Sequence, residues 1–241
     1  MSEAKRFAPD AVTEVVHDLR APLAVASGYL SMLRDGTFGP APERWEAPLD
    51  VLTAKLEETR LLVDDVLALR RLDQDVAAPS DQVVDLNEVA RTAAERAQPR
   101  AQLLSGSVVV EGDCARSVLA RGDEHQTLRI LDNLINNALL YSGEERRVVL
   151  RVEDDAGPQL AVEDSGPGIP RNVREHLFEP YTRARGSTVA GHGLGLFISR
   201  KLARQMRGEL ALDERRGRRG GRFVLRLRAP NDGLPASAAS A

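Results

Sequence analysis

The sequence predicts an α+β protein in two parts: an N-terminal helical hairpin, then an α/β sandwich in which a layer of helices covers a sheet. Three observations indicate this. Residues 12–33 and 49–66 carry apolar side chains at helical spacing. Beyond residue 76, short β-type runs replace that pattern, and three further helical patterns lie among them. A chain of 241 residues is long enough for two modest domains.

The first part has two heptad seams. In the first seam, apolar residues follow one another at alternating steps of four and three, namely Val12, Val16, Leu19, Leu23, Ala26, Leu30 and Leu33. The run RDGTFGPAPERWEAP interrupts the pattern with glycine and proline. The second seam comprises Leu49, Leu52, Leu56, Val63 and Val66. A single hairpin cannot bury both seams, so we expect two copies to pair as a dimeric four-helix bundle. Packing of the hairpin on the rest of its own chain is the alternative.

The second part begins after the linker DVAAPSDQ. Strands are predicted for VVDL, SVVVEG, RRVVLRVED, QLAVED, GELALDE and RFVLRLR, on a mixed or antiparallel sheet. Helices are predicted at 86–104, 124–141 and 194–207. Asp85 and Glu88 are spaced as a capping box, and Gly208 stands at the expected C′ position of the last helix. The predicted domains are 1–76 and 77–229, followed by a disordered tail at 230–241.

The composition argues against several classes of partner and location for this protein. The net charge of −3 gives no reason to expect nucleic acid or an anionic membrane as a partner. The run RRGRRGGR near the C-terminus is better explained as a hairpin turn. The single cysteine, Cys114, excludes an intramolecular disulfide. The uncharged stretch from Ala21 to Leu33 is shorter than the roughly 20 residues of a membrane-spanning helix. We therefore expect a cytoplasmic protein without direct membrane insertion.

Two glycine-rich segments could approach a ligand with their backbone. In VEDSGPGIP, Asp164 ends a strand and is followed by Gly166 and Gly168 in a tight loop. In GHGLGLFISRKLARQM, glycines lead directly into an amphipathic helix whose N-terminus favours phosphate. That second segment is not a dinucleotide-binding fingerprint, because no strand immediately precedes it. An ordinary turn is the alternative for either segment taken alone.

The segment LDNLINNALLYS carries three asparagines inside a predicted helix, against helix propensity. Asn133 and Asn137 are four residues apart and share one face. Amide oxygens suit magnesium, so a role in binding magnesium and phosphate is favoured over plain surface amides.

The histidines other than His17 have no metal-ligand spacing and are interpreted as surface or packing residues. They are His125, His176 and His192.

Taken in order, five segments resemble the sequence boxes of sensor histidine kinases of two-component systems. HDLRAPL resembles the H-box, NLINNALLYS the N-box, DSGPGIP the G1 box, LFEPYTR the F-box and GHGLGLFIS the G2 box. The resemblance extends from about residue 10 to about residue 228. It implies a dimerisation and histidine-phosphotransfer hairpin followed by a catalytic ATP-binding domain of the Bergerat type.

The resemblance implies an ATP-dependent protein histidine kinase that phosphorylates itself on His17 and passes the phosphoryl group to an aspartate of a response regulator receiver domain. His17 follows the seam residue Val16 by one position, so it faces outward from the bundle core. Its neutral imidazole can act as a nucleophile near pH 7. Asp18 resembles the adjacent carboxylate that takes a proton from the other ring nitrogen. Pro22 can bend the helix just beyond them.

The resemblance also implies a site for ATP and Mg²⁺. Asp164 would receive the adenine amino group, Gly166 and Gly168 would shape the base pocket, and Asn137 would hold Mg²⁺. The other residues implied at the nucleotide site are Asn133, Tyr141, Arg183, Arg185, Gly191, Gly193, Leu194 and Gly195. Of these, the glycines would hinge a lid and cradle the phosphates, and the two arginines would lie in that lid.

Two positions depart from the family's pattern. Leu140 stands where a basic residue often reaches the phosphates, and Ala21 stands where a threonine or asparagine often holds water for dephosphorylating the regulator.

Two other functions are alternatives to a kinase: a phosphotransfer adaptor or scaffold with an inert ATP domain, and a chaperone-like or anti-sigma ATPase-fold protein. No sensor module is recognisable, so either a separate sensor protein supplies the input or the sequence is part of a longer protein.

Overall fold

The computed structural model describes residues 9–73, 82–112, 116–143, 145–182, 193–213 and 220–231. They form two compact units, a helical hairpin and an α/β domain, which are described separately. The predicted linker falls almost wholly outside the described residues, as do Cys114 and most of the predicted tail. The predicted domain boundaries at residues 76 and 229 therefore stay predictions.

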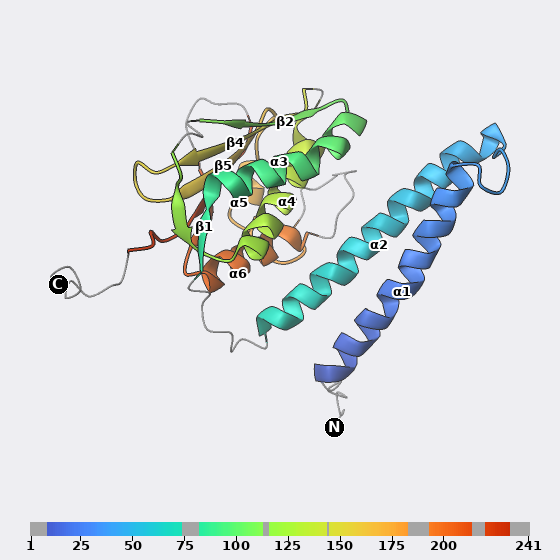
Figure 1. Ribbon diagram of the computed structural model, residues 1–241, viewed down its shortest axis with the longest axis horizontal. Helices are drawn as coiled ribbons and strands as arrows, with labels where there is room; N and C mark the ends of the chain where they lie inside the picture. The colour runs from blue at the N-terminus through green and yellow to red at the C-terminus, as the bar shows by residue number, and fades with distance from the viewer. Residues whose placement is uncertain are drawn as a thin grey trace. The chain divides into compact units, whose positions relative to one another are not determined.

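The hairpin consists of two long helices, α1 (Pro9–Arg34) and α2 (Glu46–Asp73), with the short 3₁₀ helix η1 (Glu43–Trp45) before α2. Helices α1 and α2 lie side by side, and α1 continues through Pro22 (Figure 1). Val63 is buried against Leu23 and Val66, as the two seams predict. By contrast, the seam residues Leu19 and Leu52 remain 45% and 53% exposed within one chain.

The main sheet of the α/β domain has five strands in the order β2-β4-β5-β7-β6. The strands are β2 (Ser107–Glu111), β4 (Arg147–Glu153), β5 (Gln159–Asp164), β7 (Arg222–Arg226) and β6 (Glu209–Leu212). Strands β2 and β4 are parallel, and the other neighbours are antiparallel, so the sheet is the mixed one of the two predicted alternatives. Two short strands, β1 (Val83–Asp85) and β3 (Leu119–Arg121), form a separate antiparallel pair.

Three helices, α3 (Leu86–Leu103), α4 (Glu124–Tyr141) and α6 (Gly195–Gln205), pack together and against the sheet (Figure 1). The core lies between these two layers. Because side chains alternate along a strand, Leu160 and Val162 of β5 point to one face, and both are fully buried. Asp164 shares that face. The sequence did not indicate β3 or the one-turn helix α5 (Arg171–Arg174).

Two predicted helix ends differ in detail. Asp85 caps α3 as predicted, but its side chain accepts from the N–H of Asn87 at 2.9 Å, the N2 position. At the end of α6, the prediction of Gly208 at C′ is wrong. Arg207 occupies C′ with φ of 56°, and Gly208 follows and donates to the Ala203 carbonyl at 2.8 Å, which is a Schellman motif. Glycine is required at 208 because a Cβ there would overlap a backbone carbonyl of β7.

Candidate functional site

Asp164 sits at the end of β5 with both carboxylate oxygens engaged by backbone donors. Its Oδ1 accepts from Gly166 N–H at 2.8 Å and its Oδ2 accepts from Gly221 N–H at 3.0 Å. Its own N–H donates to the Gly221 carbonyl at 3.0 Å. Burial raises the pKa of the carboxyl group, and the two backbone hydrogen bonds partly offset that effect. The result is a desolvated acceptor held in one orientation.

Glycines surround this carboxylate because the backbone passes too close for side chains. A Cβ on Gly166 would lie 2.5 Å from the Tyr141 carbonyl, and one on Gly221 would lie 2.8 Å from Asp164 Oδ2. Gly220, with φ of 91°, has no room for a Cβ next to the Asp164 backbone. Gly168, with φ of 81°, faces the Gly220 carbonyl. The structure thus brings Asp164, Gly166 and Gly168 together, as expected for these residues.

The sequence alone did not indicate Gly220 and Gly221 as members of this site. They lie in the run RRGRRGGR, whose glycines predict a turn, and β6 and β7 do pair antiparallel next to it. The usable signal was the pair of consecutive glycines directly before a strand.

On α4, the two candidate asparagines differ in their surroundings. Asn133 Nδ2 donates to Ser199 Oγ of α6 at 2.9 Å, and its Oδ1 occupies the space that a Cβ on Gly195 would need. Asn133 therefore joins α4 to the first turn of α6. Asn137 lies one turn later, half-buried, and its side chain has no hydrogen bond to the described residues. Tyr141 ends the helix with its side chain 42% exposed.

The backbone segments before and after residues 183–192 are hydrogen-bonded to each other. Tyr181 N–H donates to the Gly193 carbonyl at 3.0 Å. Tyr181 has φ of 63°, an uncommon conformation for a residue with a side chain, and Gly193 has φ of 70°. Leu194 is buried at the N-cap of α6. The structure therefore places the two ends of the expected lid next to each other, whereas Arg183, Arg185 and Gly191 lie outside the described residues.

An aromatic contact and a cation–π contact attach Phe178, just before residues 183–192, to the rest of the α/β domain. Phe178 packs edge-on against Phe223 of β7 with ring centroids 6.3 Å apart. The guanidinium carbon of Arg200, on α6, lies 4.7 Å from the centroid of the Phe178 ring. The segment preceding residue 183 is thus attached to both β7 and α6.

His17 and Asp18 lie in the helical backbone of α1, one turn before Pro22, and their side chains are outside the described part of the chain. Among the other histidines, His176 is exposed and pairs with Glu179 at 3.0 Å, which raises its pKa. His125 is also exposed, and His192 is outside the described residues. No helix in the described ranges is long and apolar enough to span a membrane.

Comparison with protein families agrees with this division into two parts. Residues 10–75 match the model of the His Kinase A (phospho-acceptor) domain. Residues 122–231 match the histidine kinase-, DNA gyrase B-, and HSP90-like ATPase model. The chain belongs to the sensor histidine kinases of two-component systems.

Several curated sensor proteins are similar to this chain. Sensor protein DivL of Caulobacter vibrioides is 32% identical over an alignment of 231 residues, which covers 94% of this chain and 29% of that protein. Sensor protein kinase WalK of Staphylococcus epidermidis is 27% identical, covering 86% of this chain and 34% of that protein. The alginate biosynthesis sensor protein KinB of Pseudomonas aeruginosa is 28% identical, with 92% and 37% covered. The chain thus spans about a third of the length of these relatives.

Two solved structures share the fold. Full-length ShkA in complex with AMPPNP has a TM-score of 0.66 and 26% identity, covering 93% of this chain and 48% of that one. The nucleotide-free catalytic domain of histidine kinase ThkA has a TM-score of 0.51 and 25% identity, covering 60% and 94%.

Proposed function

We propose that the chain is an ATP-dependent protein histidine kinase that phosphorylates itself on His17 and then passes the phosphoryl group to an aspartate of a response regulator. The observation that carries the proposal is the desolvated Asp164 carboxylate, fixed by two backbone N–H groups inside the domain that matches the ATPase model. The matched phospho-acceptor domain contains His17 and Asp18.

The Asp164 carboxylate suits the adenine end of ATP. Each oxygen accepts one backbone hydrogen bond, and a carboxylate oxygen has a second lone pair for another donor. The exocyclic amino group of adenine is such a donor, whereas guanine carries an acceptor oxygen at the equivalent position. Since Gly166, Gly168, Gly220 and Gly221 leave no side chains beside the carboxylate, a flat base can approach it. ATP should therefore bind more tightly than GTP.

The phosphate end would lie along α4 and the start of α6. Asn137 would supply an amide oxygen to Mg²⁺, because its side chain has no hydrogen bond to the described residues. Bound Mg²⁺ neutralises charge on the phosphate oxygens, which is the chemistry that phosphoryl transfer needs most. Asn133, Gly193, Leu194 and Gly195 would shape the wall beside it. Arg183, Arg185 and Gly191 would belong to the lid and Tyr141 would border the base, by resemblance to the family.

In the first step, one imidazole nitrogen of His17 attacks the γ-phosphorus, and the bond from that phosphorus to the bridging oxygen of ADP breaks. Asp18 accepts the proton from the other ring nitrogen and keeps the imidazole nucleophilic. In the second step, an aspartate carboxylate of the regulator attacks the phosphorus, the nitrogen–phosphorus bond breaks, and the proton held by Asp18 returns to the ring, which restores the neutral imidazole.

Transfer to receiver domains tests the proposed function. The protein is labelled with γ-labelled ATP and Mg²⁺, freed of nucleotide and mixed with a panel of receiver domains. Label should leave the protein and appear on a receiver as an acyl phosphate, and a receiver with aspartate replaced by asparagine should stay unlabelled. Tight nucleotide binding without any labelling would instead favour the adaptor or scaffold.

A further inference from the structure

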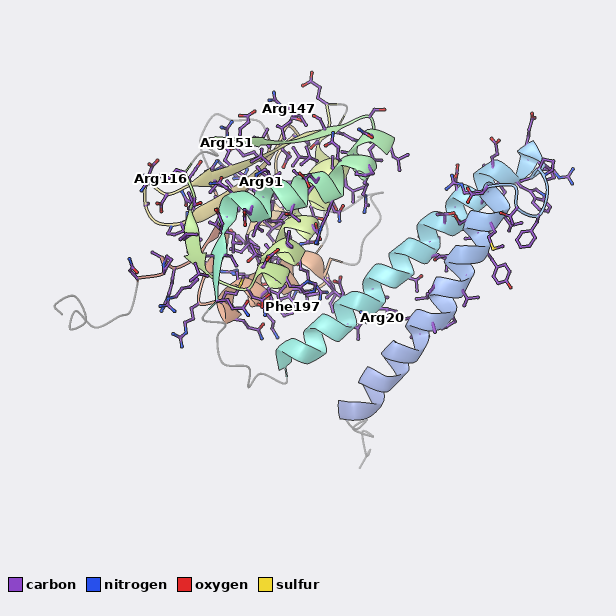
Figure 2. The ribbon with its side chains drawn as sticks, in the orientation of Figure 1. Arg20, Arg91, Arg116, Arg147, Arg151 and Phe197 are labelled. Atoms are coloured by element: carbon purple, nitrogen blue, oxygen red, sulfur yellow. The ribbon has the colours of Figure 1, made fainter. Side chains whose placement is uncertain are left out.

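The sheet face opposite the helices carries a connected set of charged side chains. On β4, Arg147 and Arg151, both labelled in Figure 2, pair with Glu111 of β2 at 2.7 and 2.6 Å. Arg151 also lies 3.5 Å from Glu163 of β5. The chain of ion pairs continues from Glu163 to Arg222 of β7, so charges connect four neighbouring strands across this face.

Arg222 is the buried member of this set, with only 6% of its side chain exposed. Its Nε donates to Asp213 at 3.0 Å, its Nη1 donates to Glu163, and its Nη2 reaches both oxygens of Glu153 at 2.9 Å. Burial lowers the pKa of the guanidinium, but the bonds to Glu153 and Glu163 outweigh this and raise it. Arg222 is therefore a permanent cation that holds three carboxylates from three segments.

The position of Arg222 relative to the candidate site is fixed by the sheet register. Glu163 and Arg222 are directly paired in the β5–β7 ladder. Next to this pair, Asp164, one residue after Glu163, and Gly221, one residue before Arg222, exchange hydrogen bonds. Because successive side chains alternate between faces, the ion pair lies on one side of the sheet and the Asp164 carboxylate on the other.

Gly221 and Gly220 have no side chains with which to hold their own backbone in place. Arg222 is the first residue of β7 whose side chain anchors this strand end. If that anchor loosens, the N–H of Gly221 moves away from Asp164 Oδ2, and the carboxylate loses one of the two bonds that orient it.

We propose that Arg222 is a positioning residue that sets base specificity, by holding Gly221 where it orients Asp164 for the exocyclic amino group of adenine. The inference rests on the proposed function, since it takes Asp164 as the adenine acceptor. Arg222 itself touches no nucleotide, because it lies on the opposite face of the sheet.

The test is the ratio of GTP to ATP dissociation constants, measured by displacement of a fluorescent nucleotide from the full chain with Mg²⁺. In Arg222→Lys a single ammonium keeps the charge but cannot reach three carboxylates in the geometry of a guanidinium. The ratio should fall roughly 2- to 10-fold, the worth of about one hydrogen bond. The matched control is Arg226→Lys, on the same strand and face, where the exposed side chain pairs only weakly with Glu209 at 3.4 Å. It should keep the parent ratio.

One further variant and the parent's own ratio keep the outcomes separate. Glu163→Gln weakens the same ion pair without removing Arg222, so it should lower the ratio in the same direction and decides the matter if Arg222→Lys does not fold. A parent that prefers ATP together with an Arg222→Lys variant of unchanged ratio would overturn this inference alone. A parent that binds ATP and GTP equally would overturn the assignment of Asp164, and this inference with it.

Discussion

Asn133 of α4 and Gly195 of α6 touch so closely that the Asn133 amide oxygen fills the place of a Gly195 side chain. The same amide donates to Ser199 one turn further along α6, at 2.9 Å. One side chain thus contacts α6 at two successive turns and limits how closely the two helices approach there. Because α6 starts immediately after the expected lid, this contact connects the N-box helix to the lid's end.

This contact predicts that Gly195→Ala destabilises the domain. Alanine normally improves a helix over glycine, but here the new methyl group must displace Asn133, and overpacking of this kind costs about 1–3 kcal/mol. The loss should appear as a lower denaturant midpoint. Gly28→Ala in α1 is the matched control, because no described atom beyond its chain neighbours and the adjacent backbone of its own helix lies within 4 Å of the added Cβ. That change should stabilise by about 0.5–1 kcal/mol. If Asn133→Ala does not relieve the cost of Gly195→Ala in a double-mutant cycle, the contact is not its cause.

Asn137→Ala should abolish autophosphorylation while leaving the fold and the dimer intact. The side chain is half-buried on α4 and has no hydrogen bond to the described residues, so its removal leaves no unpaired partner among them. Asn133→Ala, in contrast, should also lower the thermal midpoint, because it breaks the bond to Ser199. Labelling and thermal melts of both variants distinguish the roles, and near-normal labelling of folded Asn137→Ala would contradict the proposed metal ligand.

ATP affinity should fall on acidification at a higher pH than for an ordinary carboxyl group. Burial raises the pKa of Asp164 above its ordinary value of 3.8. Protonation removes the anionic acceptor for the amino group, so binding is strongest above the raised pKa and is lost as pH falls through it. The stability of the folded domain depends on pH in the opposite direction to ATP affinity. Because the folded-state pKa exceeds the unfolded one, this group's contribution to the unfolding free energy decreases as pH rises through the same window. A binding titration that shows no loss of ATP affinity until the ordinary carboxyl range would contradict this.

Residues 10–75 should dimerise through the two seams. Leu19 and Leu52 belong to these seams, yet they stay about half exposed in one chain, as expected if a second copy covers them. Leu52→Glu should therefore shift the sedimentation coefficient toward that of a monomer. Val51→Glu is the matched control, because Val51 is 60% exposed but lies outside the seam. A monomeric parent at micromolar concentration would refute the predicted dimer.

The helices and strands could largely be predicted because their signals are local. Periodicity predicted helix 124–141 with the observed bounds, and all six expected strands occur. The sequence could not indicate β3, since three residues are too few to show alternation. The two consecutive glycines before β7 mark Gly221 as an unusual position, but the sequence could not show its partner Asp164, which is 57 positions away in the chain. The C′ position of α6 was misassigned because the left-handed backbone falls on Arg207, while Gly208 is needed for a tertiary contact.

The protein should have little phosphatase activity toward its regulator. Ala21 stands four residues after His17, and its methyl group cannot hold a water molecule in line with a phosphoryl group. Decay of the phosphorylated regulator should therefore hardly quicken when ADP and a His17→Gln variant are added. Ala21→Thr is the variant expected to introduce activity. Rapid dephosphorylation by the parent, with no label returning to His17, would show that Ala21 does not limit this reaction.

Labelling of His17 tests the central claim most directly. The parent and His17→Gln are incubated with γ-labelled ATP and Mg²⁺, and the products are exposed to acid and to base. The parent should carry label that acid removes and base does not, as a phosphoramidate does, and His17→Gln should carry none. Label that persists in His17→Gln, or that behaves as a phosphoserine, would contradict the account.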